Sequence, residues 1–337
     1  MHAYGEVMVR VIGTTLIGRV TGAGSAGRTD ERFGIHATDL GIMWDGGDGR
    51  VLVLFGDTYD RGWGGHGGGP AHAGWRCNVL AYSSARDLTA GLELDGVVAG
   101  PDGSAAQVIA SDPGRRDEAT VIPNAGIAVD GRQYAHYMSV RRWGPPGHWT
   151  TNYAGIAVSD DGGNTWVNPA EGRWINRAEH DHPFQIAAFT RDGDYVYLLG
   201  TTNGRFGDAY LARVGPEAVA DVRAYTYWTG NGWVRDEFLA SPVLPGPVGE
   251  LSVAYNVHFG LWLALHLDEH RGAILLRTAS RLTGPWSAGE PVASGAEYPA
   301  LYGGYLHPWF LDGPEIYFLL SQWGPYNVFL LRSRLSG

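Results

Sequence analysis

The amino-acid sequence of 337 residues predicts an all-β protein folded as a five-bladed β-propeller. Three observations predict this fold: strand signals recur along the chain, one strand-turn-strand outline appears five times, and one turn carries a propeller signature. Few windows place apolar residues at helical spacing, and the best short helix candidate covers residues 216–223. β-Branched and aromatic runs bounded by Gly, Asp, Asn and Pro recur instead, which is typical of strands.

Each copy of the repeated outline has an inner strand, a turn and a stronger apolar strand, followed by outer strands. The inner strands are expected at residues 39–44, 125–129, 184–190, 251–256 and 305–311, and their partners at 51–56, 133–140, 195–200, 262–267 and 316–321. Repeats spaced by roughly 55 to 85 residues match four-stranded propeller blades with long insertions at some rims.

The ends of the chain are expected to meet in one blade. Residues 14–20 have no hairpin partner nearby, and we expect them to complete the last blade beside residues 328–333. This pairing would close the ring without an exposed strand edge. Residues 1–337 are expected to form one domain, because propellers of this length commonly fold as a single unit.

The propeller signature is the segment 159–166, Ser-Asp-Asp-Gly-Gly-Asn-Thr-Trp, which matches the Asp-box pattern S-x-D-x-G-x-T-W. Its Asp and glycines favour a tight turn between outer strands, and its Trp is expected to pack beneath the turn. The motif therefore predicts a structural role, and no catalytic role is assigned to its acidic residues.

Composition limits the partners and the chemistry. The net charge of −10 argues against nucleic acid and anionic membranes, which bind basic surfaces. No Lys occurs in the chain, which excludes Schiff-base chemistry and a phosphate-loop lysine. The 51 glycines and 13 tryptophans suit many turns and many flat contact surfaces. A neutral ligand such as a sugar fits this balance best.

Cysteine content and hydropathy give further expectations. Cys77 is the only cysteine, so an internal disulfide and a thiolate metal cluster are both unavailable. No window reaches the roughly 18 uninterrupted apolar residues of a membrane span. The N-terminal residues lack the pattern of a signal peptide. We expect a monomer that needs no membrane and no partner protein.

Two aspartates are the candidate catalytic residues. Propeller active sites lie at one end of the central axis, where the innermost strands begin. Asp39 directly precedes the first inner strand, and Asp57 ends the antiparallel strand beside it, so both can reach one end of the blade. Two carboxylates facing one cavity are the minimum equipment for glycoside cleavage. The alternatives are a strand-entry Asp that bonds backbone amides and an ordinary strand-ending turn.

Other polar residues were expected at the beginnings of inner strands. Glu118 and Glu250 precede the inner strands of blades two and four, where they could bind substrate hydroxyls or adjust a neighbouring pKa. Asn124, Gln185 and His307 are expected at comparable positions and suit hydroxyl recognition. The alternative for the two glutamates is that they lie in a solvated loop. The alternative for the other three residues is that they are polar groups of the inner strands whose hydrogen bonds are made within the protein.

Two loop segments complete the candidate site. In the triplet 180–182, Asp181 and His182 resemble metal ligands, but no third ligand follows at a defined spacing, so we expect rim residues that touch sugar and no metal. A glycine-rich rim loop follows Asp57 and presents Trp63 and Trp75 as contact surfaces. No cofactor is expected.

The chain resembles a known family at five places, and their order and spacing are more specific than any single one. The matching pieces are 38–41 (Thr-Asp-Leu-Gly), 55–58 (Phe-Gly-Asp-Thr), 137–140 (Tyr-Met-Ser-Val) with Trp143-Gly144, 152–155 (Asn-Tyr-Ala-Gly) and 249–252 (Gly-Glu-Leu-Ser). Together they resemble glycoside hydrolase family 183, a family of five-bladed endo-D-arabinanases, from about Thr15 to the C-terminus.

The resemblance implies a substrate and a place of action. The substrate would be the D-arabinofuranan of mycobacterial arabinogalactan and lipoarabinomannan, and the enzyme would act outside the cell or on the cell wall. The two essential aspartates of the family correspond by local motif to Asp39 and Asp57, in agreement with the reading of the residues themselves. The resemblance therefore implies that the chain cuts α-D-arabinofuranosyl linkages inside arabinan.

Three alternatives stay open at this point. The Asp box invites a sialidase, although arginines are not found at the matching inner-strand starts that would bind a sialic acid carboxylate. An arabinofuranosidase would remove sugars from chain ends instead of cutting within the polymer. A sugar-binding propeller without catalysis, such as a lectin or a phage receptor-binding module, would bind arabinan and release nothing.

Overall fold

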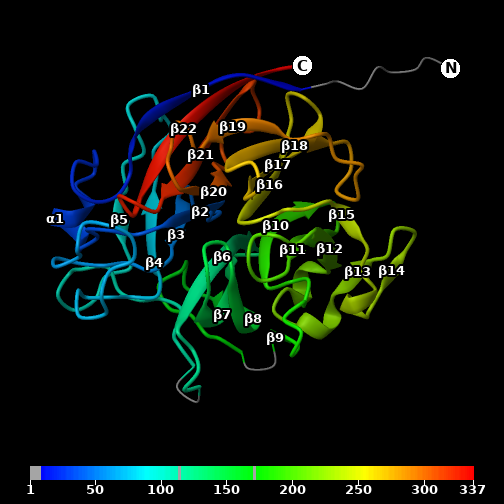
Figure 1. Ribbon diagram of the computed structural model, residues 1–337, viewed down its shortest axis with the longest axis horizontal. Helices are drawn as coiled ribbons and strands as arrows, with labels where there is room; N and C mark the ends of the chain where they lie inside the picture. The colour runs from blue at the N-terminus through cyan, green and yellow to red at the C-terminus, as the bar shows by residue number, and fades with distance from the viewer. Residues whose placement is uncertain (1–8, 113–114, 170–171) are drawn as a thin grey trace.

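The computed structural model describes residues 9–112, 115–169 and 172–337, and it confirms the predicted all-β, five-bladed propeller. Five antiparallel sheets are arranged around a ring (Figure 1). Their innermost strands contact one another in the order β2, β6, β10, β16, β20 and back to β2. The beginnings of these five strands therefore meet at one end of a central axis.

The strands of each blade follow one another in the sequence, apart from β1. The first blade contains β2 (Leu40–Asp45), β3 (Val51–Phe55), β4 (Val79–Ser83) and β5 (Gly96–Val97). The second contains β6 (Thr120–Val129), β7 (Arg132–Trp143), β8 (Trp149–Ser159) and β9 (Arg173–Ile175). The third contains β10 (Ile186–Asp192), β11 (Tyr195–Thr201), β12 (Ala209–Val214), β13 (Thr226–Trp228) and β14 (Trp233–Val234), with β15 (Pro242–Leu244) paired to β12.

The remaining two blades come from the C-terminal part of the chain and from its first described strand. The fourth contains β16 (Leu251–Asn256), β17 (Leu261–Asp268), β18 (Ala273–Ala279) and β19 (Glu290–Ser294). The fifth contains β20 (Leu301–Leu306), β21 (Glu315–Gln322), β22 (Asn327–Ser336) and β1 (Arg10–Arg19). β1 pairs antiparallel with β22, from Arg10 opposite Ser336 to Arg19 opposite Phe329, and both strands lie along one side of the ring (Figure 1).

Helical structure is limited to short pieces. One α-helix, α1 (Thr29–Phe33), and three turns of 3-10 helix, η1 (Pro216–Ala218), η2 (Val222–Ala224) and η3 (Glu237–Leu239), occur in the described chain. The helix expected over residues 216–223 is thus two separate 3-10 turns, η1 and η2. None of the described helices has the length and apolar character needed to cross a membrane.

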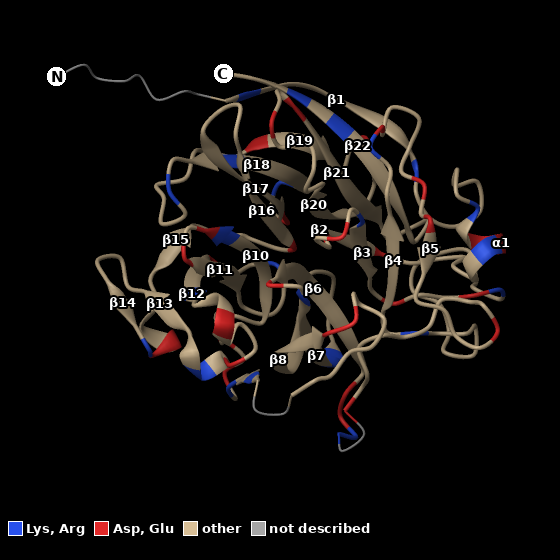
Figure 2. Ribbon diagram, turned by 180° about the vertical axis from the view of Figure 1, so that it is seen from behind, with Lys and Arg blue, Asp and Glu red and all other residues tan. Residues whose placement is uncertain are grey.

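Acidic and basic residues are both distributed around the ring (Figure 2).

Packing between blades depends on side chains that cross from one sheet to the next. Trp44 of β2 lies against Gly126 of β6, where a Cβ would overlap the indole ring. The Trp44 Nε1–H also donates to Gln133 Oε1 at 2.8 Å. A buried Trp that satisfies its N–H contributes a large apolar area without an unpaired donor. This contact fixes the first blade against the second near the central axis.

The inner strand of the last blade differs from the sequence prediction. β20 runs from Leu301 to Leu306, whereas residues 305–311 were expected. Gly303 and Gly304 lie inside it with φ of 81° and 137°, and the register with β21 shifts between Tyr302 and Tyr305. A glycine pair normally indicates a turn, but here it forms a bulge within the strand. The strand therefore begins earlier than its sequence suggests.

The Asp-box turn has the hydrogen bonds of a structural motif. Asp161 Oδ1 accepts from the Ser159 hydroxyl at 2.8 Å and from the Thr165 N–H at 2.9 Å, and Oδ2 accepts from the Thr165 hydroxyl at 2.7 Å. The Trp166 Nε1–H closes the turn on the Gly163 carbonyl at 2.8 Å. All these bonds lie within one turn after β8, at the outside of the second blade.

We expect Asp161→Ala to lower the free energy of unfolding by about 1–3 kcal/mol, because it removes the acceptor of three hydrogen bonds in the turn. The catalytic rate of the folded protein should stay within about twofold of the unchanged chain. Chemical denaturation and a rate assay on the same preparation measure both quantities. A selective loss of rate at normal stability would contradict the structural assignment.

Candidate active site

A cavity of about 760 Å³ opens at the end of the axis where the inner strands begin. Its floor contains residues at the start of β2, β6, β10, β16 and β20. Its walls come from the glycine-rich loop after β3, from the loop between β7 and β8, and from the turn between β21 and β22. Asp39, Asp57, Asn124, Glu250 and Trp75 all line this cavity, so the structure brings these five predicted residues together.

Asp39 is held at the cavity floor by the closure of the ring. Its Oδ2 accepts hydrogen bonds from the hydroxyls of Tyr302, at 2.9 Å, and Tyr326, at 3.1 Å, both from the last blade. Its Oδ1 is buried and has no hydrogen-bond partner within the described part of the chain. A Cβ on Gly56 would overlap this Oδ1, so a side chain at position 56 would displace the carboxylate. Oδ2 of Asp39 is thus fixed by two hydrogen bonds, whereas Oδ1 accepts none from the described residues.

The backbone after Asp39 explains how the carboxylate leaves the sheet. Leu40 and Gly41 both have positive φ, 67° and 90°, and the register between β2 and β3 shifts at this point. A leucine in the left-handed region is strained, and such strain persists only where the surrounding structure imposes it. The Leu40 N–H is held by the Ser321 hydroxyl at 2.8 Å. The bulge turns the residue before the strand toward the axis.

Asp57 follows β3 and is held from two other segments. Its Oδ1 accepts from the Trp75 Nε1–H at 2.8 Å and from the Thr120 hydroxyl at 2.7 Å. Trp75 belongs to the glycine-rich loop and Thr120 begins β6 of the second blade. Neither bond uses Asp57 Oδ2, so this oxygen is available to a ligand in the cavity.

The environments of the two carboxyl groups differ. Burial and, second, the nearby charge of Asp57 raise the pKa of Asp39 to about 8, although the two tyrosine hydroxyls oppose this shift. Burial also raises the pKa of Asp57 to about 6, against the effect of the Thr120 and Trp75 hydrogen bonds. Near neutral pH, Asp39 therefore keeps its proton while Asp57 is mostly ionised.

A third carboxylate, Glu250, precedes β16 on the cavity wall. Its Oε1 accepts from Arg205 Nε at 3.1 Å and from Arg205 Nη2 at 2.9 Å. Arg205 also pairs through Nη1 with Glu269 Oε2 at 3.3 Å. Both partners of this arginine line the same cavity, so the site contains a compact network of one cation between two carboxylates.

Asn124 lies between two cavities. It lines the cavity of the aspartates and also a smaller one at the opposite end of the axis. Its Nδ2 is within 3.2 Å of His136 Nδ1 and donates to the Gln185 carbonyl at 3.4 Å. Gln185 itself is fully buried, accepts from the Thr151 hydroxyl and donates to the Trp174 carbonyl. Gln185 is thus a polar group beside the inner strand whose hydrogen bonds are made within the protein, and it does not line the cavity.

Four other predicted residues lie outside the cavity lining. Glu118 accepts from the Asp112 N–H at 2.9 Å and from the Ser139 hydroxyl at 2.6 Å. Asp181 is paired with Arg177, and His182 is buried with Nε2 at 3.5 Å from Glu237 Oε1. Trp63 donates to the Gly67 carbonyl within its own loop. Their hydrogen bonds and ion pairs stabilise the loops in which they lie.

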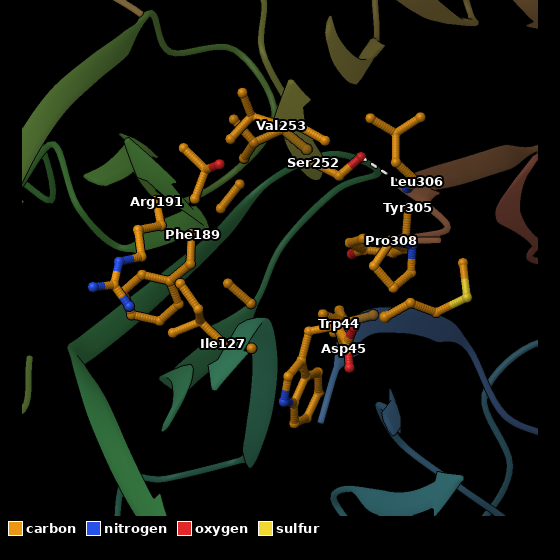
Figure 3. A pocket seen from close by; sticks show the side chains of 18 of the residues that line it. Trp44, Asp45, Ile127, Phe189, Arg191, Ser252, Val253, Tyr305, Leu306 and Pro308 are labelled. Carbon is orange, nitrogen blue, oxygen red and sulfur yellow. Dashed lines mark hydrogen bonds between the residues drawn. The ribbon is translucent and has the colours of Figure 1, made fainter. Parts of the chain in front are cut away.

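His307 lies at the other end of the axis, contrary to its expected position. The inner strand of this blade, β20, begins at Leu301 and ends at Leu306, so His307 follows the strand instead of preceding it. The cavity at this end has a volume of about 320 Å³ and is lined by the later halves of the inner strands (Figure 3). The Ser252 hydroxyl accepts from the Leu306 N–H at 3.1 Å beside it. His307 therefore does not join the aspartate pair.

Several cavity residues were missed by sequence reasoning. They are Tyr302, Tyr326, Thr120 and Arg205. Tyr302 and Thr120 begin inner strands that were expected to start three or more residues later, so a correct strand start would have identified them. Arg205 belongs to the loop between β11 and β12, and no signal in the sequence distinguishes it from other loop arginines.

Within residues 9–112, 115–169 and 172–337, no three His, Cys, Asp or Glu side chains lie in an arrangement that could hold a metal ion. Glu250 and Glu269 are each engaged by Arg205, and Asp39 and Asp57 each accept two hydrogen bonds.

The fold is similar to those of several solved structures. A protein of Bacteroides ovatus ATCC 8483 is similar with a TM-score of 0.62 at 11% identity, covering 94% of this chain and 93% of the other. The exo-beta-1,3-galactanase of Phanerochaete chrysosporium gives 0.58 at 13% identity, covering 95% and 64%. The alpha-L-arabinofuranosidase of Podospora anserina gives 0.54 at 12% identity, covering 97% and 98%.

Two curated fungal proteins are similar to the chain over most of their length. Notoamide biosynthesis cluster protein J of Aspergillus sp. (strain MF297-2) is 30% identical, covering 94% of this chain and 91% of that protein. Notoamide biosynthesis cluster protein J' of Aspergillus versicolor is 33% identical, covering 87% and 82%. A family model described as a domain of unknown function, DUF4185, matches residues 24–332. On this match and these relatives, the chain belongs to the DUF4185 family.

Proposed function

We propose that this chain is a glycoside hydrolase in which Asp39 is the general acid and Asp57 is the anionic partner. One observation carries the proposal: two buried carboxyl groups face one cavity, with pKa values raised to about 8 and about 6. In glycosidases, two carboxyl groups in different environments commonly have different pKa values. One group then acts as the acid while the other is ionised. The division of roles follows from the two pKa values, because the group with the higher value keeps its proton near neutral pH.

The carboxyl group of Asp39 passes its proton to the glycosidic oxygen as the bond to the anomeric carbon breaks. The hydroxyls of Tyr302 and Tyr326 hold this carboxyl group in place through Oδ2. Asp57 Oδ2 then either bonds to the anomeric carbon or removes a proton from an attacking water. Trp75 and Thr120 hold the other oxygen of Asp57 and keep the carboxylate in place.

The substrate we propose is arabinan with α-D-arabinofuranosyl linkages, cut within the chain. The sequence resemblance to endo-D-arabinanases supports this substrate, and the similarity to a galactanase and an arabinofuranosidase supports the glycosidase class at the level of the fold. A polymer in a bacterial cell wall would require the enzyme to act outside the cell or on the wall. The binding of a neutral polysaccharide also agrees with the charge of −10.

Two exposed tryptophans support cleavage within the polymer. Trp143 is 50% exposed at the end of β7, and Trp323 is 48% exposed in the turn between β21 and β22. Both line the cavity, and each is packed edge-on against a further ring, Trp149 or Tyr326. Rigid aromatic faces at two places on the rim suit sugar rings on either side of the cleaved bond.

We expect digestion of arabinan to release oligosaccharides of several sizes in the first minutes, because internal bonds are accessible to a site with binding surfaces on both sides. Purified protein is incubated with mycobacterial arabinogalactan, and the products are separated by chromatography over a time course. Free arabinose alone from the earliest time point would contradict the endo mode. Binding without release of any sugar would favour the lectin alternative.

A second candidate follows from the fungal relatives. Their names associate them with the biosynthesis of notoamide, and they share 30% and 33% identity with the chain. A cavity of about 760 Å³ could also hold a compact molecule, on which the same two aspartates would act as acid and base. Failure of arabinan, galactan and xylan as substrates, together with tight binding of small heterocyclic compounds, would favour this candidate.

A further inference from the structure

Glu250 lines the cavity, and one of its carboxylate oxygens has no hydrogen-bond partner among the described residues. The residue is only 8% exposed, and both hydrogen bonds from Arg205 go to Oε1. Oε2 is buried and has no hydrogen-bond partner among the described residues. A buried carboxylate oxygen without a donor costs free energy, so the position is favourable only when a ligand supplies the donor. A sugar hydroxyl is such a donor.

Arg205 fixes this carboxylate in position. Its guanidinium bridges Glu250 and Glu269 and lies over the ring of Tyr302, 5.1 Å from the centroid. The hydroxyl of the same tyrosine donates to Asp39 at 2.9 Å. Glu250 and the proposed acid are thus attached to one rigid unit, and a sugar hydroxyl bound by Glu250 would lie in the ring next to the cleaved bond.

The charges of the cavity favour an uncharged ligand. Four acidic residues line the cavity: Asp39, Asp57, Glu250 and Glu269. Among the described residues, Arg205 is the one arginine in this lining. Both glutamates already share its guanidinium. An acidic sugar would therefore meet carboxylates without a free cation to pair with, and repulsion between close like charges in a buried site is costly.

We propose that Glu250 anchors an uncharged sugar ring beside the aspartate pair by accepting a hydroxyl hydrogen bond at Oε2, and that the same carboxylate excludes acidic sugars. This inference rests on the proposed function, because it assigns the ring that is bound during cleavage. It also argues against a sialidase, whose substrate carries a carboxylate. Arg205 is a positioning residue that acts through Glu250.

The first test is Glu250→Gln, which keeps the shape of the side chain. It removes the negative charge and replaces one of the two carboxylate oxygens by an NH2 group. We expect kcat/KM on arabinan to fall by about 10- to 100-fold, the value of a hydrogen bond to a charged group. Glu290→Gln is the matched control, because it breaks the ion pair with Arg10 in the outer strands of neighbouring blades. Its kcat/KM should stay within about twofold of the unchanged chain.

The second test measures binding and does not depend on cleavage. Calorimetry on the Asp57→Asn protein compares a short arabino-oligosaccharide with its derivative in which the primary hydroxyls are oxidised to carboxylates. We expect the neutral ligand to bind at least about 10-fold more tightly, and Glu250→Gln in the same background to reduce this preference several-fold. A loss of packing alone would weaken both ligands equally and leave the ratio unchanged.

The outcomes separate this inference from the proposed function. Normal cleavage of arabinan by Glu250→Gln, or equal binding of the neutral and acidic ligands, overturns the inference and leaves the hydrolase proposal standing. Absence of cleavage by the unchanged chain overturns the hydrolase proposal, while the binding ratio still decides the role of Glu250. If Glu250→Gln fails to fold, equal binding of the two ligands by the protein with intact Glu250 still overturns the inference.

Discussion

Replacement of Asp39 or Asp57 by Asn should reduce hydrolysis of arabinan by about 10²-fold or more, the usual effect of removing a general acid or base. Asn at position 39 cannot deliver a proton to the leaving oxygen, and Asn at position 57 can neither attack carbon nor activate water. Both changes keep the size of the side chain, so the hydrogen bonds from Tyr302, Tyr326, Trp75 and Thr120 retain an oxygen acceptor. The release of reducing ends measures the loss.

Stability supplies the control for the two variants. Burial raises the pKa of Asp39 to about 8, so between the unfolded pKa of about 4 and pH 8 the native state binds a proton that the unfolded chain has lost. The stability of the unchanged protein therefore decreases as pH rises through this range. Asp39→Asn removes the titration, and its melting temperature near pH 8 should equal or exceed that of the unchanged protein. Near-normal turnover in either variant would show that the replaced residue is not catalytic.

The fold was predictable because each inner strand pairs with the strand that follows it in the sequence. Each of the first four has a clear apolar run beside a stronger strand and a turn of Gly or Asp, and periodicity recognises such segments. The fifth was misplaced because Gly303 and Gly304 interrupt its run, and a sequence does not show whether a glycine pair turns the chain or bulges within a strand. The same error moved His307 to the wrong end of the axis.

The candidate site was predictable where polar or aromatic side chains lie at strand ends or in the glycine-rich loop, and five such residues line the cavity: Asp39, Asp57, Asn124, Glu250 and Trp75. Asp39 and Asp57 follow from the antiparallel pairing of β2 and β3, which the sequence indicates. The groups that control their protonation come from other blades: Tyr302 and Tyr326 are 263 and 287 residues away from Asp39, and Thr120 is 63 residues away from Asp57. Such contacts arise from closure of the ring, and no local pattern encodes them.

The rate of hydrolysis should depend on pH as a bell-shaped curve, because activity requires Asp57 ionised and Asp39 protonated. With pKa values of about 6 and about 8, kcat/KM should rise with pH through the first value and fall through the second, with a maximum between them. Beyond either value the rate should change by about tenfold per pH unit. The two apparent values belong to the interacting pair, since each charge affects the other. A profile that is flat between about pH 5 and pH 9 would contradict this pair of roles.

Two hydroxyl deletions should move opposite limbs of this curve. Tyr302→Phe removes a donor that stabilises the anion of Asp39, which raises the pKa of Asp39 and moves the alkaline limb to higher pH. Thr120→Val removes a donor that stabilises the anion of Asp57, which raises the pKa of Asp57 and moves the acid limb to higher pH. The first variant should therefore widen the active range and the second should narrow it. If the two pKa values belonged to the opposite aspartates, Tyr302→Phe would shift the acid limb instead, so the profiles of these two variants identify which aspartate keeps its proton between the two limbs.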